Sequence, residues 1–384
     1  MVATETVVRV HKLPTTSITL RRALYTFCVL AGLLAVPQVL AAVLPEDRVD
    51  SMYHVYKGGD DVTVTGPALL VRKSVGDSVS LSGRYYMDSI SSASPDVVSA
   101  GSPYRDKREE FGLGVDVLHG NSLISAFLSS SKENDYLADT YGLNVAHDLF
   151  GGLTTVNMGF SQGKDLVQRV DTDFEAGINR YNFRLGLSQV LGKSLLLGLS
   201  YEGIAEDGFL NSPYRTARVL TLPQDEKYPG TRDSQAFALR LVKGFSGDSR
   251  PVGSSLRAEY RYFRDNWDIN SNTLGLAYQR YIGTRWLGEW HYRYYQQSAA
   301  SFYSDNFPAP MTYMARDKEL STFHSHSLGT KWSWTFFNRR PVRASLNLAH
   351  DYIYFSYDDY TNVLTGKLYS FGANVLQLYI SAWY

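Results

Sequence analysis

Charged residues occur at every second position in several segments, a spacing that can align side chains for selecting ions or polar solutes. In residues 256–262, Arg and Glu occupy the odd positions, and Leu, Ala and Tyr the even ones. Alternate residues of a β-strand face opposite sides, so such segments predict one charged and one apolar face. Rings of charged side chains tune the selectivity of a pore. The candidate lining residues are Arg84, Asp88, Glu110, Asp116, Arg184, Glu202, Arg240, Arg257, Glu259, Arg261, Glu289, His291, Arg293 and Arg343.

This charged row permits two interpretations. The basic residues could form one wall of a channel and the acidic residues another, which would give the lumen a selective field. Alternatively, the same residues pair with one another inside the protein and stiffen or close it. Both interpretations remain open at the level of the sequence.

Two histidines could support metal chemistry. His324 and His326 face the same side of a predicted strand, as a metal-binding pair would, but no third ligand is evident nearby. An exposed pair near the membrane interface is the alternative. Acidic residues in segments 164–178 and 358–359 could bind a divalent cation through oxygen ligands, or could simply be solvated. We predict no metal and no cofactor.

Catalysis is a weaker hypothesis. Glu289 and His291 lie near Ser298 and suggest a hydrolase, but the chain contains no G-x-S-x-G motif. Scattered Ser, His and Asp residues occur in most sequences of this length. We therefore predict that the protein is not an enzyme.

The last residues of the chain indicate where the apolar faces point. Residues 374–384 read NVLQLYISAWY, so Leu376, Leu378 and Ile380 share one face. An exposed apolar strand is an aggregation hazard on a soluble protein, but it fits a barrel whose outer face meets lipid. The aromatic ending also resembles the C-terminal strand signature of Gram-negative outer-membrane proteins.

The same alternation repeats along the chain in segments of about ten residues, the pattern of a transmembrane barrel. Short connections near 76–77, 119–121, 151–152, 192–193 and 283 alternate with longer ones at 91–106, 132–138, 164–178, 207–232, 298–318 and 358–366. We predict an all-β fold, a single antiparallel barrel of about 16 strands with both termini in the periplasm. If the first hairpin, residues 47–73, lies elsewhere, the number would be about 14.

Energetics predict which face turns inward. A basic side chain near the bilayer midplane costs roughly 2–4 kcal/mol, so Arg184, Arg257 and Arg261 are expected to face the interior. A barrel of about 16 strands is too wide for side chains alone to fill, which predicts a polar, wet lumen. Aromatic residues near strand ends suit interfacial girdles; they are Tyr85, Tyr181, Tyr201, Trp286, Trp290, Trp332, Trp334, Trp383 and Tyr384.

The N-terminus has the features of an export signal. Basic residues precede the apolar run 23–36, which is too short to span a bilayer comfortably, and Ala41 and Ala42 offer cleavage sites. We predict a cleaved signal peptide at 1–42 and an outer-membrane barrel at 43–384, exported through the periplasm. An uncleaved anchor is the alternative.

Composition narrows the partners. The chain has 38 basic and 38 acidic side chains, which argues against nucleic-acid binding. Mean hydropathy of -0.22 excludes a helical membrane bundle. The single Cys, Cys28, lies in the signal peptide, so the mature chain has no thiol. Expected partners are outer-membrane lipid and lipopolysaccharide, and the barrel assembly machinery through the C-terminal strand.

Several stretches together carry a resemblance to a known family. They are residues 47–54, 104–116, 185–190 (LGLSQV), 208–215 (GFLNSPYR), 259–263 (EYRYF), 293–295, 302–305 and 315–322 (ARDKELST). Together they resemble an uncharacterised family of Gram-negative outer-membrane barrel proteins, a domain family of unknown function. The resemblance implies a barrel and brings no activity, substrate or catalytic residue. Such proteins tend to be encoded with periplasmic redox or flavin-attachment proteins, so a periplasmic partner is an expectation of the resemblance.

These observations lead to a ranked expectation. The first hypothesis is a porin-like channel for small polar solutes with a mixed-charge lumen. The second is a non-catalytic structural or receptor barrel that seats a periplasmic or surface partner, possible contact surfaces being the loops 207–232 and 298–318. A barrel hydrolase ranks last.

Overall fold

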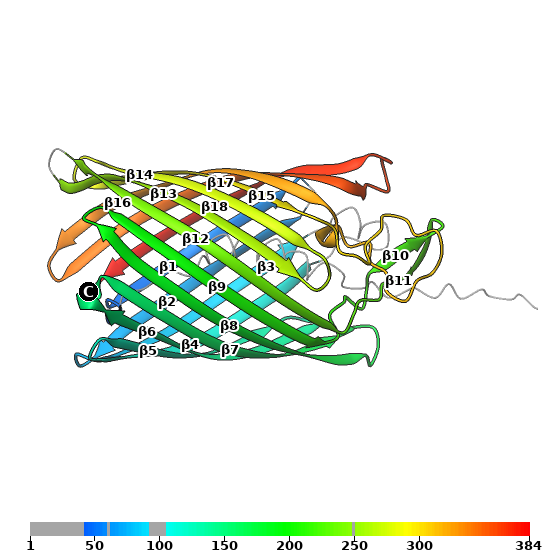
Figure 1. The fold of residues 1–384 in the computed structure, drawn as a ribbon, viewed down its shortest axis with the longest axis horizontal. Helices are drawn as coiled ribbons and strands as arrows, with labels where there is room; N and C mark the ends of the chain where they lie inside the picture. The colour runs from blue at the N-terminus through cyan, green and yellow to red at the C-terminus, as the bar shows by residue number, and fades with distance from the viewer. Residues whose placement is uncertain (1–41, 60–61, 92–104, 248–249) are drawn as a thin grey trace, which may run out of the picture.

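The computed structural model describes residues 42–59, 62–91, 105–247 and 250–384. The predicted signal peptide, 1–42, lies outside this part except for Ala42, and so does most of the predicted loop 91–106. The described residues form a closed antiparallel barrel of 16 strands, with a small hairpin beyond one rim (Figure 1). The predicted fold class and strand number are confirmed.

The strands follow one another around the wall in chain order. They are β1 (Arg48–Gly58), β2 (Thr63–Val75), β3 (Val79–Ser91), β4 (Arg105–His119), β5 (Ser122–Lys132), β6 (Tyr136–Leu149), β7 (Thr154–Gln168), β8 (Glu175–Gly192), β9 (Leu195–Gly208), β12 (Thr231–Gly247), β13 (Arg250–Asp265), β14 (Asn270–Ile282), β15 (Trp286–Gln297), β16 (Phe323–Arg339), β17 (Val342–Thr361) and β18 (Leu368–Trp383). The hairpin consists of β10 (Thr216–Val219) and β11 (Leu222–Asp225), and two short 3-10 turns are η1 (Phe150–Gly152) and η2 (Lys318–Leu320). Within this part of the chain, no helix is long and apolar enough to cross a membrane.

Pairing closes the sheet on itself. β1 pairs with β18, and β9 pairs directly with β12, so the β10–β11 hairpin stands outside the wall. A closed sheet has no free strand edge, which removes the aggregation hazard of an exposed one. All neighbours are antiparallel, and the register shifts lie near strand ends, at Val190/Gly192, Phe245/Gly247, Thr335/Phe337 and Ser356/Thr361. Alternate residues therefore keep one face inward along most of each strand.

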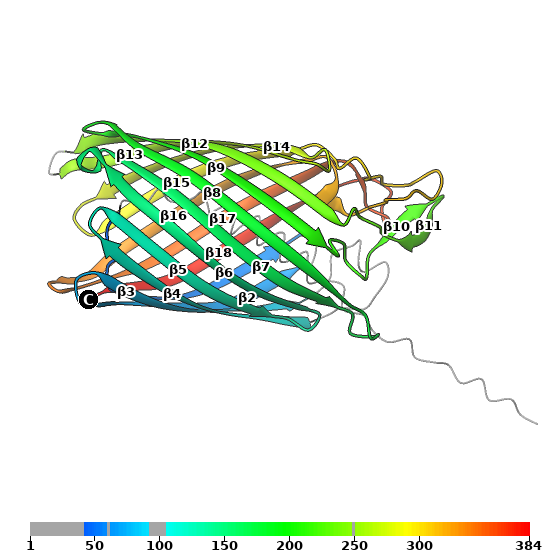
Figure 2. The same cartoon turned by 60° about the horizontal axis from the view of Figure 1, so that its bottom comes forward.

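The two rims differ in their connections. Short turns and both ends of the barrel segment lie at one rim (Figures 1 and 2). The long connections lie at the other rim, together with the short connections 133–135 and 266–269. Gly76 and Gly283 serve the short turns with φ of 67° and 60°, which Gly adopts without strain. We call these the short-turn rim and the long-loop rim. That the short-turn rim faces the periplasm follows from the general rule for such barrels and stays a prediction.

The two ends of the barrel are fastened together at the short-turn rim. Lys73 Nζ and the backbone N–H of Ser74 each donate to the Asp47 carboxylate at 2.5 Å. These bonds, the one from Lys73 above all, lower the pKa of Asp47 to about 2. The Tyr384 hydroxyl donates to the carbonyl of Arg72 at 3.2 Å. The final residue therefore helps to hold the closing strands in register.

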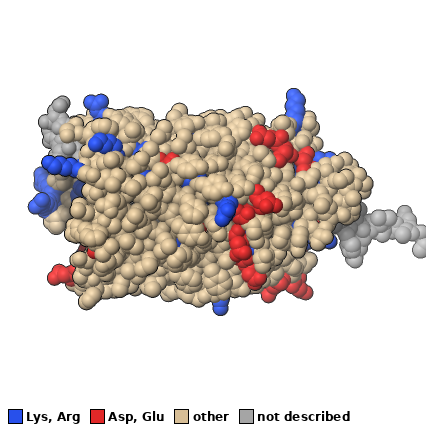
Figure 3. Space-filling model, viewed as in Figure 1, with Lys and Arg blue, Asp and Glu red and all other residues tan. Residues whose placement is uncertain are grey.

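The outer wall is apolar, as the last strand predicts. Leu376, Leu378 and Ile380 are 43%, 48% and 48% exposed, whereas Val375 and Ser381 on the opposite face are 2% and 1% exposed. On the face drawn in Figure 3, the middle of the wall carries few charges, basic residues gather near the short-turn rim and acidic residues toward the other. This distribution matches a band of lipid contact between two polar rims.

One predicted girdle residue faces the other way. Trp286 and Trp290 are exposed on the outer wall, as expected of girdle residues. Trp383 instead lies on the inner row, where the guanidinium carbons of Arg343 and Arg48 lie 4.1 and 5.1 Å from its ring centre. The prediction for Trp383 was wrong because alternation places it opposite Tyr384 and Ala382.

A charge on the outer row tests this orientation. We expect Leu376→Arg to lower the free energy of unfolding in lipid vesicles by roughly 2–4 kcal/mol, because the guanidinium would enter hydrocarbon. Gln377→Arg is the matched control, since the neighbouring residue faces inward. Urea titration followed by tryptophan fluorescence measures both. Equal stability of the two variants would contradict a lipid-facing outer row.

Several predicted loops contain regular structure. In segment 164–178, β7 continues to Gln168 and β8 begins at Glu175; the loop 207–232 holds the β10–β11 hairpin. After the predicted loop 298–318, strand β16 begins only at Phe323, following η2. Backbone N–H and C=O groups need hydrogen-bond partners whether the side chain of the residue is polar or apolar. Strand pairing therefore continues past the apolar band that faces lipid, whereas the alternation in the sequence marks only that band.

Candidate functional site

The predicted lining residues lie on the inner row of the wall. Arg240 is in register with Glu259, Glu259 with Gly275, and Gly275 with Arg293, so these residues share one level and one face. Arg343 lies on the same row at the short-turn rim, 3.8 Å from Glu46. Whether they line an open pore stays a prediction.

Ion pairs link most of these residues to neighbouring strands. Arg84 and Arg108 both contact Glu110, at 3.0 and 2.9 Å. On the other half of the wall, Arg184 Nε donates to Glu202 at 2.9 Å, and Arg261 approaches the same carboxylate at 3.4 Å. Bases and acids thus interleave around the wall.

The next level continues this arrangement. Arg240 contacts Glu259 at 2.6 Å, and Arg257 lies between Glu259 and Glu289, at 3.4 and 3.6 Å. The two remaining acids have separate partners: Asp88 contacts His54 at 2.8 Å, and Asp116 accepts a hydrogen bond from Ser125 at 2.5 Å. Separate basic and acidic walls are not formed by these residues, and the geometry favours the pairing interpretation for them.

A glycine makes room for one lateral pair. His291 Nε2 lies 2.5 Å from an Asp351 carboxylate oxygen, and its Nδ1 lies 3.6 Å from Glu289. Gly329 separates His291 from Asp351 in the register, and a Cβ there would overlap both side chains. Ser298 follows seven residues beyond His291, about 20 Å along an extended strand, so it does not join this group as the hydrolase hypothesis requires.

The two histidines of the metal hypothesis face outward. His324 and His326 lie on the outer row of β16 with ring centres 5.8 Å apart. His326 Nδ1 lies 2.8 Å from the hydroxyl of Tyr292, and His324 lies 3.7 Å from Asp358. Among the residues that the structure describes, no group of three or more His, Cys, Asp or Glu could hold a metal ion. The geometry fits the interfacial pair.

The acidic residues near 164–178 also have separate partners. Asp165 forms an ion pair with Arg180 on the inner wall. Asp171 pairs with Arg169 at 2.7 Å, and Glu175 accepts from a Gln168 side chain. They do not converge on a common cation position.

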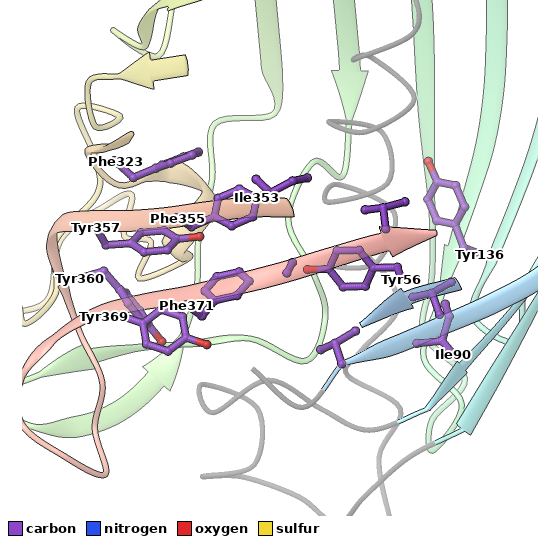
Figure 4. Close-up of a cluster of buried hydrophobic side chains, with 14 of the residues drawn as sticks. Tyr56, Ile90, Tyr136, Phe323, Ile353, Phe355, Tyr357, Tyr360, Tyr369 and Phe371 are labelled. Carbon is purple, nitrogen blue, oxygen red and sulfur yellow. The ribbon is translucent and has the colours of Figure 1, made fainter. Parts of the chain in front are cut away.

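The inner row is apolar toward the long-loop rim, which corrects the expectation of a polar lumen throughout (Figure 4). We call this group the inner aromatic cluster; it comprises Tyr56, Val62, Val64, Ile90, Tyr136, Val167, Ile178, Phe323, Ile353, Phe355, Tyr357, Tyr360, Tyr369, Phe371, Ala373 and Val375. Phe355 stacks on Phe371 with ring centres 4.8 Å apart. In this part of β17 both rows are apolar, so alternation did not reveal that one of them faces inward.

The β15–β16 loop, residues 298–322, reaches this cluster. Lys318 in η2 is only 2% exposed, and its Nζ lies 5.3 and 5.1 Å from the ring centres of Tyr369 and Phe371. Such distances fit cation–π contacts. The loop therefore bends toward the inner wall of β18 instead of projecting into solvent.

Arg316 anchors the loop, and sequence reasoning missed it. Its guanidinium contacts Asp305 at 2.7 Å, donates to the carbonyl of Thr361 at 2.6 Å and lies 4.5 Å from the Tyr360 ring centre. Its backbone N–H donates to Glu226 at 2.7 Å. Arg316 is 7% exposed. The stretch ARDKELST was the available signal, but nothing local shows that its Arg is buried.

The loops meet one another above the barrel. Arg215 of the β9–β12 loop, residues 209–230, forms an ion pair with Asp317. Trp267 and Phe302 pack edge to face with ring centres 5.0 Å apart, and bridges join Val219 to Phe307 and Lys227 to Met314. The two loops proposed as partner surfaces thus bury part of their surface against each other.

A cavity lies inside the barrel below these loops. Its volume is about 670 Å³, and its walls are the inner rows of β8, β9 and β12–β15 together with both loops. Six arginines and four carboxylates line it: Arg180, Arg184, Arg215, Arg232, Arg261 and Arg293 with Glu202, Glu259, Asp317 and Glu319. A volume between about 300 and 1,000 Å³ suits a small organic ligand. The site is thus a solute-sized chamber with polar and aromatic walls.

A closed 16-strand antiparallel sheet with an apolar outer wall, a charged inner row and long loops at one rim defines a transmembrane β-barrel of the outer-membrane type. Residues 175–352, from β8 into β17, match the profile of a family described as "Protein of unknown function (DUF3570)". The expected resemblance to an uncharacterised barrel family is thereby confirmed. Of the stretches that carried it, 47–54 and 104–116 lie outside the matched region.

Several solved structures match most of this chain at low sequence identity. A structure titled bacterial polysaccharide outer membrane secretin matches with a TM-score of 0.48 and 7% identity, covering 88% of this chain and 99% of that one. OpdK from Pseudomonas aeruginosa matches with a TM-score of 0.45 and 9% sequence identity, and the match covers 88% of this chain and 99% of that one. The structure titled CymD monoaromatic hydrocarbon channel matches with a TM-score of 0.45 and 10% sequence identity, and the match covers 92% of each chain. No curated protein matches the sequence.

Proposed function

We propose that this protein is an outer-membrane channel for small polar solutes, exported through the periplasm with cleavage near Ala42. The cavity of about 670 Å³ inside the barrel supports this most directly, because a structural barrel has no need of a solute-sized polar chamber. Wide barrels of this class commonly hold an aqueous channel. The inward β15–β16 loop would narrow the passage at the long-loop rim.

Planar lipid bilayers test the channel directly. We expect the refolded mature protein to produce discrete conductance steps in potassium chloride, because charged and polar groups line the chamber. A heat-unfolded sample of the same preparation is the control. A properly folded barrel, verified by circular dichroism, that gives no step at several voltages would contradict the proposal.

A second candidate is a barrel that seats a surface partner. Leu220 and Leu222 at the β10–β11 hairpin and Met311 in the β15–β16 loop are 65%, 66% and 55% exposed, beyond the long-loop rim. Exposed apolar groups on a loop favour contact with another protein. Crosslinking and pull-down from outer-membrane extract separates the two functions, since a channel alone returns itself and the assembly machinery. A periplasmic redox partner rests on the family resemblance alone.

A further inference from the structure

The cavity contains one arginine, Arg293, that the described residues do not neutralise. In the described part of the chain, no carboxylate forms an ion pair with Arg293, and its guanidinium carbon lies 5.7 Å from the ring centre of Tyr295. Its neighbour in the register on one side is Gly275, which has no side chain, and beyond it Glu259 is held by Arg240 and Arg257. A half-buried guanidinium without a counter-charge is costly, and a bound anion would remove that cost.

The surrounding charges favour the same ligand. Arg184 and Arg261 share a single carboxylate, Glu202, and Arg261 lies at the longer distance, 3.4 Å. Arg180, Arg215 and Arg232 pair with Asp165, Asp317 and Asp265. The attraction for a small anion therefore comes from Arg293 and from Arg184 and Arg261, which have one carboxylate between them. Guanidinium groups also bind carboxylates through two parallel hydrogen bonds.

Aromatic rings form the other part of the chamber. Phe263 and Trp267 line the cavity on the long-loop side, along with Tyr228, and Tyr295 lies beside Arg293. A flat apolar ring can pack against such side chains while its charged group faces the arginines. One lining carboxylate, Glu319, forms no ion pair with any described residue and would repel an anion.

We infer that this cavity is a binding subsite for small aromatic carboxylates, with Arg293 as the group that holds the carboxylate. The inference rests on the proposed channel function, because it names the class of solute that would pass. It assigns Arg261 and Arg184 to supporting the anion and the aromatic lining to the ring.

Calorimetric titration of the folded protein in detergent tests the inference, with benzoate as the probe. Acetate has the charge without the ring, and benzylammonium has the ring with the opposite charge. We expect saturable benzoate binding, about tenfold weaker acetate binding and no saturable binding of benzylammonium. Benzylammonium binding as tight as that of benzoate would overturn the inference.

Two variants locate the site. Arg293→Gln is expected to weaken benzoate binding about tenfold or more, and Glu319→Gln to leave it equal or tighter. Arg84→Gln is the matched control, because Arg84 lies on the inner row of β3, outside the cavity. Unchanged binding in Arg293→Gln, or a loss as large in Arg84→Gln, would overturn the assignment.

Conductance in potassium chloride separates this inference from the channel proposal. A conducting barrel that does not bind benzoate refutes the subsite and keeps the channel. A barrel that binds benzoate through Arg293 without conducting refutes the channel and keeps the subsite.

Discussion

Removal of the Arg316 side chain is expected to release the β15–β16 loop from the inner wall. Its guanidinium joins Asp305, within the same loop, to the carbonyl of Thr361 at the end of β17. The bond from its backbone N–H to Glu226 remains in the variant. Breaking a buried ion pair by deleting one partner costs roughly 3–5 kcal/mol. Because the barrel wall does not depend on these contacts, we expect the substitution to destabilise the loop and leave the stability of the barrel unchanged.

Two measurements check Arg316→Ala. In planar bilayers, single-channel conductance should rise by about twofold or more as the narrowing loop leaves the lumen. Limited proteolysis should cut within 298–322 much faster than in the parent protein, and this readout does not depend on conduction. Tyr313→Ala is the matched control, since this side chain of the same loop is 45% exposed. A loop that stays protected and a conductance that stays constant would contradict the anchoring role of Arg316.

Gly66→Ala is expected to impair assembly of the barrel itself. Pairing between β2 and β3 lapses at Gly66 and Pro67, between the pairs Thr65↔Ser89 and Ala68↔Tyr86. A methyl group at Gly66 would overlap the backbone carbonyl of Met87. Backbone atoms cannot turn aside as a side chain can, so we expect a loss of about 3 kcal/mol in the free energy of unfolding.

Gly83→Ala is the matched control for this substitution. Gly83 lies on β3, and a methyl group there would meet only Leu113 Cδ2, at 3.9 Å, so a change within about 0.5 kcal/mol is expected. Urea unfolding and the fraction that runs as folded barrel on unheated gels measure both. Equal behaviour of the two variants would show that the β2–β3 pairing can relax around Gly66.

The irregularity at Gly66 and Pro67 was open to prediction from the sequence. Pro cannot donate to a strand ladder, and this chemistry belongs to the residue itself. The tight contact with Met87 was not open to prediction, because it depends on how closely the next strand approaches.

The charged residues illustrate the same division. That Arg257, Glu259 and Arg261 face inward follows from alternation and from the cost of charge in lipid. That Arg257 lies between Glu259 and Glu289, while Arg293 has no acidic partner among the described residues, depends on the register of three strands. The sequence could therefore name the inner row without showing which of its charges remain available to a solute.

The sequence by itself determined the class of fold, the strand number and the direction of the apolar and charged rows. These properties arise from a period of two residues and from the contrast between lipid and water, and both act locally. Only the tertiary structure decided that the long loops turn inward, that the inner row becomes aromatic toward one rim, and that a chamber forms below these loops. Those features join residues far apart in the chain, such as Arg316 and Glu226, which are 90 positions apart. Contacts over such separations depend on barrel closure, which no local pattern encodes.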